Sequence, residues 1–188
     1  EHIYENNCTI NEVREVISWD HFSWGNYVYD KALEWSEIID GLMKKHSSEN
    51  KNLAIDVCDP AGINALTNNY DYKIINAQKF LEIARSIKSE EEIICIKASI
   101  KTAEKGILLM HENLKAGITE EELWSILHKT NIENGGEWFE TRLLNSGPKT
   151  NPWFQECSSR IIQKGDIVAF DTDMIGPYGY CADISRSF

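Results

Sequence analysis

The sequence predicts a mixed α/β (α+β) protein whose chain consists of two successive parts. A strand–helix–strand pattern lies within the first 85 residues and is typical of α/β domains. Two long helices with N-terminal capping signals follow, the first of them starting at residue 89. Short apolar runs separated by turn residues fill the chain beyond residue 136. Hydrophobic residues make up 42% and charged residues 26% of the chain, which excludes wholesale disorder.

The first part contains the elements of one βαβ unit. Apolar residues recur at helical spacing between Asp30 and Met43, so we expect a helix there. Leu53–Val57 is a short apolar run that predicts a buried strand, and Asp59–Gly62 is expected to turn the chain. A helix then begins at Ile63, and Tyr72–Ile75 predicts the second strand.

Two consecutive helices open the second part. Ser89 and Glu92 form a capping box before a long row of apolar residues at steps of three and four, and Gly117 is expected to end that helix. Thr119 and Glu122 repeat the capping box for a second helix that runs to the glycine pair near residue 135. The spacing predicts two antiparallel helices whose apolar faces are core.

A β-hairpin is expected at the end of the sequence. Ile167–Met174 predicts one strand, Gly176–Gly179 a turn, and Tyr180–Phe188 the return strand. The chain stops within that return strand, so we interpret it as a fragment of a longer protein.

Three aspartates on this hairpin are the candidate metal ligands. Asp171 and Asp173 are two residues apart on one predicted strand, so their side chains are expected to share a face. Asp183 on the return strand is expected near Asp171. Converging carboxylates repel one another, and divalent cations such as Mn, Fe or Zn would relieve this repulsion. A solvated acidic hairpin or a calcium site is the alternative interpretation.

Net charge excludes several classes of partner. The chain carries 19 Lys and Arg against 30 Asp and Glu, a formal net charge of −11. Nucleic acids and anionic membranes would be repelled, and no apolar run is long enough to span a bilayer. A cationic or zwitterionic ligand, or metal ions, would be attracted.

The cysteine pattern indicates a reducing compartment. There are five cysteines, an odd number without any CxxC pair: Cys8, Cys58, Cys95, Cys157 and Cys181. This pattern favours free thiols over a disulfide framework, and we expect a cytoplasmic protein.

The hairpin motif resembles a known superfamily. Gly165–Asp171 followed by Gly179–Arg186 resembles the first half of the dinuclear metal motif in the pita-bread superfamily, which includes methionine aminopeptidases, prolidases and creatinases. The resemblance implies that Asp171 and Asp183 are metal ligands, and that the remaining ligands, a His and two Glu, lie beyond Phe188. It also implies that residues 86–188 are the N-terminal half of a pita-bread catalytic domain, and that residues 1–85 are the C-terminal part of a creatinase-like N-terminal domain.

The chain departs from the peptidases of this superfamily at two places. Asp173 stands where they usually have glycine. Their catalytic histidine falls between the Ser-Gly turn and the metal strand, but Gly147–Arg160 contains no histidine, and Trp153 and Phe154 occupy the expected position. Without that proton-handling group, peptide hydrolysis is disfavoured.

One branch of the superfamily matches these departures. The segments Ser146–Glu156 and Phe170–Asp183 are similar to the metal-dependent dimethylsulfoniopropionate (DMSP) lyases of marine bacteria. The resemblance implies β-elimination of DMSP, a small zwitterionic sulfonium substrate, to dimethyl sulfide and acrylate. It implies two divalent metal ions, with Fe foremost and Mn, Zn, Co or Ni as alternatives, a general base beyond residue 188, and a homodimer at full length.

Aromatic residues are candidates for holding the sulfonium group. Trp153, Phe154 and Tyr178 are the substrate-binding candidates, with Trp138 a further one, because aromatic faces attract cations. Ordinary packing is the alternative for each ring.

Two other functions remain open at this point. One is a metallohydrolase of the Xaa-Pro aminopeptidase, prolidase or creatinase type. The other is a pita-bread binding module without catalysis, which the retained aspartates Asp171, Asp173 and Asp183 argue against because clustered acids are costly without metal.

Overall fold

The computed structural model describes residues 12–47 and 50–188. The chain divides into two units, one ending at Ile87 and the other running from Lys88 to Phe188, and each is described by itself below. Cys8 lies outside the described residues.

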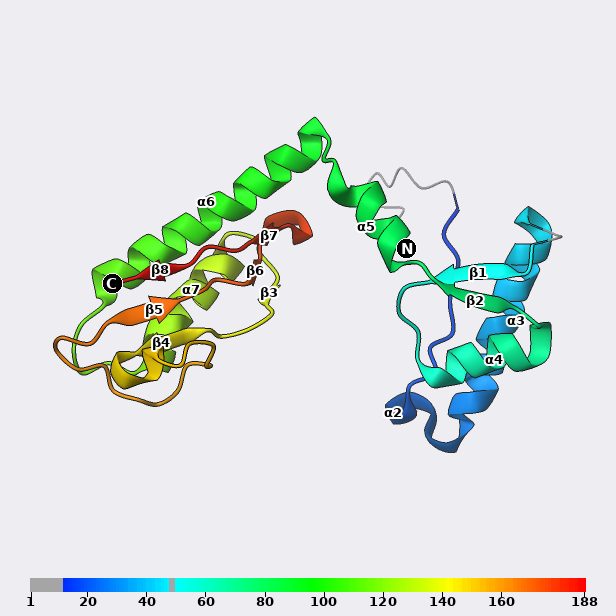
Figure 1. The fold of residues 1–188 in the computed structure, drawn as a ribbon, viewed down its shortest axis with the longest axis horizontal. Helices are drawn as coiled ribbons and strands as arrows, with labels where there is room; N and C mark the ends of the chain where they lie inside the picture. The colour runs from blue at the N-terminus through cyan, green and yellow to red at the C-terminus, as the bar shows by residue number, and fades with distance from the viewer. Residues whose placement is uncertain (1–11, 48–49) are drawn as a thin grey trace. The chain divides into compact units, whose positions relative to one another are not determined.

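The N-terminal unit is built around a small parallel sheet (Figure 1). Its elements are α2 (His21–Trp24), the 3-10 turn η1 (Gly25–Tyr27), α3 (Val28–His46), β1 (Asn52–Ile55), α4 (Pro60–Tyr70), β2 (Lys73–Asn76) and α5 (Gln78–Ser86). Strand β1 pairs in parallel with β2, with Leu53 opposite Ile74, and α4 connects them. The predicted βαβ unit is therefore confirmed.

Three details of this unit differ from the sequence-based expectation. The strand predicted as buried over Leu53–Val57 was wrong in extent and burial, because β1 ends at Ile55 and none of its residues is buried. Asp59–Gly62 is not a separate turn: Asp59 caps α4 by accepting a hydrogen bond from the backbone N–H of Gly62 at 2.9 Å, and Pro60 is the first helical residue. Proline suits that position because the first N–H groups of a helix have no partner within it. Helix α5 was not anticipated, and it buries none of its residues.

Two helices open the C-terminal unit, as expected. Helix α6 spans Glu90–Asn113, α7 spans Glu120–Glu133, and both capping boxes are present. The expectation that Gly117 ends the first helix was wrong: α6 stops at Asn113 with Leu114 as its C-cap. Gly117, at a φ of +98°, lies in the loop between the helices, where its N–H donates to the backbone oxygen of Ile162.

The remaining strands form two small sheets rather than one hairpin. They are β3 (Trp138–Phe139), β4 (Leu144–Ser146), β5 (Val168–Phe170), β6 (Met174–Ile175), β7 (Cys181–Ala182) and β8 (Arg186–Ser187). One sheet has the order β3-β6-β7 and the other β4-β5-β8, all antiparallel. The predicted strands Ile167–Met174 and Tyr180–Phe188 were therefore wrong as continuous elements, because each is interrupted in the middle.

A threonine side chain bridges the two interruptions. Thr172, which is fully buried, donates its hydroxyl to the backbone oxygen of Ala182 at 2.8 Å and accepts from the N–H of Ile184 at 2.9 Å. This side chain replaces the ladder bonds that a continuous strand pair would make there. Asp173 has a φ of +37°, a left-handed conformation that aspartate tolerates better than most residues, and the chain changes direction at this point.

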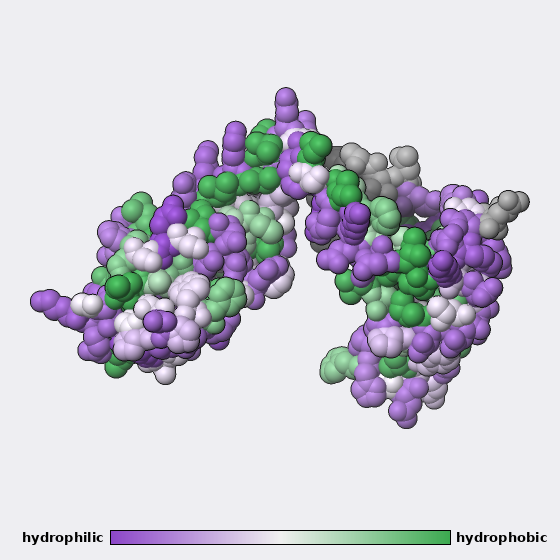
Figure 2. Space-filling model, in the orientation of Figure 1, coloured by the Kyte–Doolittle hydropathy of each residue, from purple (hydrophilic) through white to green (hydrophobic). Residues whose placement is uncertain are grey.

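The core of the C-terminal unit lies between the helices and the two sheets (Figure 1). Met110, Leu123, Leu127, Phe170 and Met174 are completely buried in it. In the face drawn in Figure 2, hydrophilic groups dominate the surface and hydrophobic groups lie between them. Within the described residues, no helix combines the length and the apolar composition needed to cross a membrane, and the four cysteines are free thiols.

Candidate metal centre

The structure brings the three predicted aspartates together. One carboxylate oxygen from each of Asp171, Asp173 and Asp183 lies within 4.8 Å of the other two. They converge for a different reason than expected, because Asp171 and Asp173 lie in the irregular link between β5 and β6, and Asp183 lies in the link between β7 and β8. All three aspartates therefore lie outside the regular strands.

Electrostatics at this cluster favour a bound cation. The hydrogen-bonding contact with Asp171, burial, and the charges of Asp171 and Asp173 together raise the pKa of Asp183 to about 6. Oδ1 of Asp171 is buried and, within the described part of the chain, has no hydrogen-bond partner. An acceptor without a donor beside crowded like charges suits a divalent ion, which would supply positive charge and ligate that oxygen.

Neighbouring backbone and side-chain contacts hold the cluster in place. The N–H of Asp171 donates to the backbone oxygen of Leu143 at 3.0 Å. Oδ2 of Asp173 accepts a short hydrogen bond from the hydroxyl of Thr141. Asp183 is the most exposed of the three, so the cluster opens to solvent on its side.

The aromatic candidates lie in loops and are mostly exposed. Trp153 is half-buried and Phe154 is 73% exposed in the loop after the 3-10 turn Gly147–Thr150, and Tyr178 is 74% exposed in the turn Pro177–Gly179. Trp138, on β3, is also exposed. Within the described residues, no hydrogen bond or ring contact joins these side chains to the three aspartates, so the structure does not test their predicted role.

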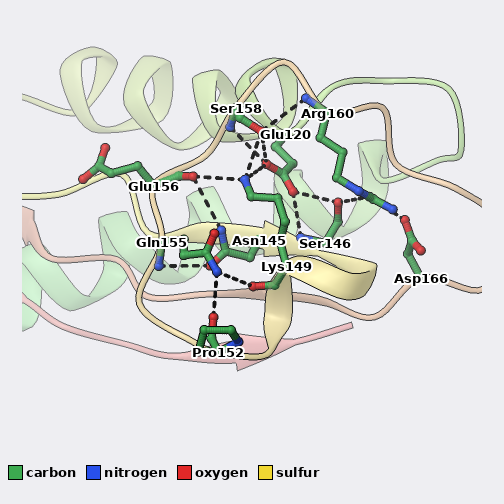
Figure 3. A network of polar contacts seen from close by, with 10 residues as sticks. All are labelled: Glu120, Asn145, Ser146, Lys149, Pro152, Gln155, Glu156, Ser158, Arg160 and Asp166. Atoms are coloured by element: carbon green, nitrogen blue, oxygen red, sulfur yellow. Dashed lines mark hydrogen bonds and ion pairs between the residues drawn. The ribbon is translucent and has the colours of Figure 1, made fainter.

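A buried carboxylate that the sequence analysis missed anchors the loop carrying Trp153 and Phe154 (Figure 3). Glu120, at the start of α7, is completely buried, and Oε1 accepts from both the N–H and the hydroxyl of Ser146 at 2.8 Å. Oε2 accepts from Lys149 at 2.7 Å and from the hydroxyl of Ser158 at 2.8 Å. One side chain thus fastens the end of β4 to both ends of the loop.

The pKa of the Glu120 carboxyl lies below its ordinary value despite the burial. Burial acts to raise this pKa, but hydrogen bonds from Lys149, Ser146 and Ser158 outweigh it. A signal for this residue was present in the sequence: Glu120 stands three, four and seven positions before Leu123, Trp124 and Leu127, on the buried side of α7. Acidic residues are common in the first turn after a capping box such as the one at Thr119, so the sequence indicated no separate role for Glu120.

A second ion pair extends the network toward β5, the strand that precedes Asp171. Arg160 donates to Oδ2 of Asp166 at 2.7 Å and makes a short hydrogen bond to the hydroxyl of Ser146. Ser146 pairs with Val168 on β5, the strand that leads directly to Asp171. The anchored loop and the aspartate cluster are therefore attached to the same pair of strands.

The fold is that of the pita-bread proteins, and the comparisons with known proteins give the family. Residues 94–188 match the model of metallopeptidase family M24. The chain belongs to this family. The prolidase from Pyrococcus furiosus has the same fold, with a TM-score of 0.71 and 23% identity over 82% of this chain and 48% of the prolidase chain.

Three curated relatives are similar in sequence. Dimethylsulfoniopropionate lyase DddP of Roseovarius nubinhibens is 38% identical over 97% of this chain, and the same lyase of Roseobacter denitrificans is 36% identical over 98%. The putative dipeptidase YkvY of Bacillus subtilis is 31% identical over 62% of this chain and 32% of its own length. The chain spans 42% of the length of each lyase.

Proposed function

We propose that the full-length protein is a metal-dependent lyase that cleaves the C–S bond of dimethylsulfoniopropionate. The observation that carries this proposal is the 38% identity to a lyase of that name across 97% of the chain, which includes both units. The three-aspartate cluster and the absence of histidine from residues 147–160 agree with it.

The proposed reaction is a β-elimination. A base removes a proton from the carbon next to the carboxylate, that C–H electron pair forms the double bond, and the C–S bond breaks with its electron pair on sulfur. Dimethyl sulfide, acrylate and one proton result, so no oxidant or reductant is needed. We place the base beyond Phe188.

We propose that Asp171, Asp173 and Asp183 are ligands of two divalent metal ions, with iron foremost and Mn, Zn, Co or Ni as alternatives. The oxygen-only donor set and the unpartnered Oδ1 of Asp171 support a hard or borderline cation. Such ions, when bound, would supply Lewis-acid stabilisation of negative charge developing beside the substrate carboxylate.

The sulfonium end of the substrate needs a different environment. It has no N–H to donate, so it is held by contact with aromatic faces and by negative potential. We propose Trp153, Phe154 and Tyr178 for this role. Their exposure in loops of the unit that carries the aspartates supports it. A homodimer and a cytoplasmic location complete the proposal.

Headspace gas chromatography over purified full-length protein tests the reaction. With DMSP and each metal supplied separately, we expect dimethyl sulfide in the headspace and acrylate in solution. Trp153→Ala is expected to lower kcat/KM for DMSP about tenfold, equivalent to about 1.4 kcal/mol, through loss of a cation–π contact. Trp24→Phe, in the other unit, is the matched control.

A dipeptidase is the second candidate, and the 31% identity to the putative dipeptidase favours it over other hydrolases. Cleavage of Xaa-Pro dipeptides without dimethyl sulfide release would replace the lyase proposal with this one. Absence of both activities in a protein that retains its metal would indicate the third candidate, a binding module.

A further inference from the structure

Thr141 lies beside the candidate metal centre, in the short segment that connects β3 to β4. Its side chain is half-buried, and its hydroxyl donates a short hydrogen bond to Oδ2 of Asp173. The two residues are 32 positions apart in the sequence, so the bond forms only when the unit folds. Nothing in the sequence around Thr141 distinguishes it from an ordinary loop threonine.

The backbone on both sides of Thr141 is tied to the link that carries two of the aspartates. The N–H of Glu140 donates to the backbone oxygen of Asp173 at 3.0 Å, and the backbone oxygen of Leu143 accepts from the N–H of Asp171 at 3.0 Å. Strand β3, which ends just before this segment, pairs with β6, which begins just after Asp173 (Figure 1). The hydroxyl of Thr141 is therefore held at a fixed position beside the aspartates.

Asp173 is the aspartate that most needs such support. It lies between two strands in a left-handed conformation, with a φ of +37°. An aspartate carboxylate turns over a broad range about its last torsion, and the like charges of Asp171 and Asp183 repel it. A hydrogen bond to one of its oxygens restricts that rotation. Threonine suits the role because its branched side chain adopts few χ1 rotamers, so little further side-chain entropy is lost.

We propose that Thr141 is a positioning residue, which holds the carboxylate of Asp173 in the orientation in which it binds a divalent ion. Carboxylates that bind metals are commonly oriented by hydrogen bonds from a neighbouring group. This inference rests on the proposed metal centre, but it is independent of the reaction that the enzyme catalyses. The alternative is a structural role, in which the bond only fastens the segment between β3 and β4.

Calorimetric titration of Mn²⁺ into the metal-depleted full-length protein tests the inference. Thr141→Val keeps the shape of the side chain but removes the hydroxyl, and we expect it to bind Mn²⁺ about tenfold more weakly than the wild type. Thr141→Ser keeps the hydroxyl and should keep most of the affinity. Thr130→Val is the matched control, because it removes a buried hydroxyl that donates to the backbone oxygen of Ile126 at 2.7 Å, within α7. Its affinity for Mn²⁺ should equal that of the wild type.

A double-mutant cycle separates positioning from a structural role. Asp173→Gly removes the carboxylate, and glycine adopts a positive φ without strain. Because Thr141 acts through Asp173, adding Thr141→Val to Asp173→Gly is expected to change the affinity for Mn²⁺ by no more than about twofold. A structural role would weaken binding in both backgrounds alike. Thermal unfolding shows that each variant is folded, and Thr141→Ala, which inserts no methyl group in place of the hydroxyl, keeps the test valid if Thr141→Val is not.

Two results would overturn the positioning role and leave the metal centre in place. They are equal affinities for Mn²⁺ in Thr141→Val and Thr130→Val, and equal weakening by Thr141→Val with and without the Asp173 carboxylate. Two others would remove the ligand or the centre on which the inference rests: wild-type affinity in Asp173→Gly, and no Mn²⁺ binding by the wild type. Dimethyl sulfide release is measured separately, so failure of the lyase proposal leaves these comparisons unchanged.

Discussion

Among the three clustered aspartates, Asp183 has the pKa that its neighbours shift most clearly. Its carboxyl lies beside two others, its pKa is raised from 3.8 to about 6, and it is the most exposed of the three. A group with a raised pKa in the folded protein stabilises the fold in its protonated form. That contribution is complete below pH 3.8 and is lost as the pH rises through about 6.

The metal-depleted full-length protein is therefore expected to lose stability relative to its Asp183→Asn variant as the pH rises through about 6. The variant cannot ionise at this position, so it escapes the repulsion from Asp171 and Asp173. Thermal unfolding in the presence of a chelator measures the difference in Tm at each pH. Parallel Tm curves for the two proteins would contradict the expectation.

Asp183→Ala is expected to weaken metal binding by about a hundredfold or more, because even residues that only support a ligand cost ten- to hundredfold when removed. Metal analysis after dialysis, together with activity, measures the loss. Asp56→Ala is the control, since Asp56 is an exposed aspartate of the N-terminal unit. Full metal content and full activity in Asp183→Ala would show that Asp183 is not a ligand.

At the scale of elements, the interrupted strand pairs depend on one hydroxyl. Thr172→Val preserves shape but removes the hydroxyl that donates to the oxygen of Ala182 and accepts from the N–H of Ile184. We expect a loss of about 1–3 kcal/mol of stability and weaker metal binding.

Thr172→Ser should retain most of both properties, because the hydroxyl remains. Thr102→Val is the matched control, a buried threonine of α6 that bridges no strands. Denaturant unfolding and metal titration of the four proteins measure the effects. A Thr172→Val protein as stable as Thr102→Val would refute the bridging role.

The loop anchor at Glu120 makes a second prediction at this scale. Glu120→Gln leaves the Lys149 ammonium without its counter-charge, so we expect a loss of about 3 kcal/mol, as for other broken buried pairs. Because the pKa of Glu120 is lowered, its stabilising contribution is present above pH 4.5 and is lost as the pH falls below that value.

The double variant Glu120→Gln/Lys149→Met should recover part of this stability, since no unpaired charge is left. Urea unfolding at pH 7 and at pH 4 compares the three proteins. The advantage of the wild type over Glu120→Gln should be smaller at pH 4 than at pH 7. An advantage that is the same at both pH values would exclude a role for the Glu120 charge.

The sequence predicted helices more accurately than strands. Capping boxes at Ser89 and Thr119 depend on a few neighbouring residues, and both were confirmed. The strand interruptions depend on Thr172, whose buried bonds to Ala182 and Ile184 form only when both segments meet. No local pattern distinguishes that threonine from one in a regular strand.

The aspartate cluster was predicted for a partly wrong reason. A continuous hairpin would place Asp171 and Asp173 on one face, but the backbone instead turns at Asp173. The convergence survives because the register around the turn keeps Ile175 opposite Cys181 and Ala169 opposite Ser187. Glu120 was missed because its partners, Ser146, Lys149 and Ser158, follow more than twenty residues later.

For the molecule as a whole, the candidate metal centre lies within one of the two units. The aspartate cluster and the loop anchor both lie between Lys88 and Phe188, and the family match begins at residue 94. Similarity to the curated lyases extends further, over 97% of the chain, and so includes the N-terminal unit. Conclusions from the M24 match therefore apply to the second unit, whereas the lyase proposal draws on both.

The short separation of the aspartates along the chain has a consequence for the order in which the protein folds. Asp171 and Asp183 are twelve positions apart, so bringing them together costs little loop-closure entropy. Thr172, next to Asp171, joins the two segments by a hydrogen bond to the backbone oxygen of Ala182, next to Asp183. The three carboxylates can therefore come together through contacts that are local in the sequence, before residues far apart along the chain have packed against one another.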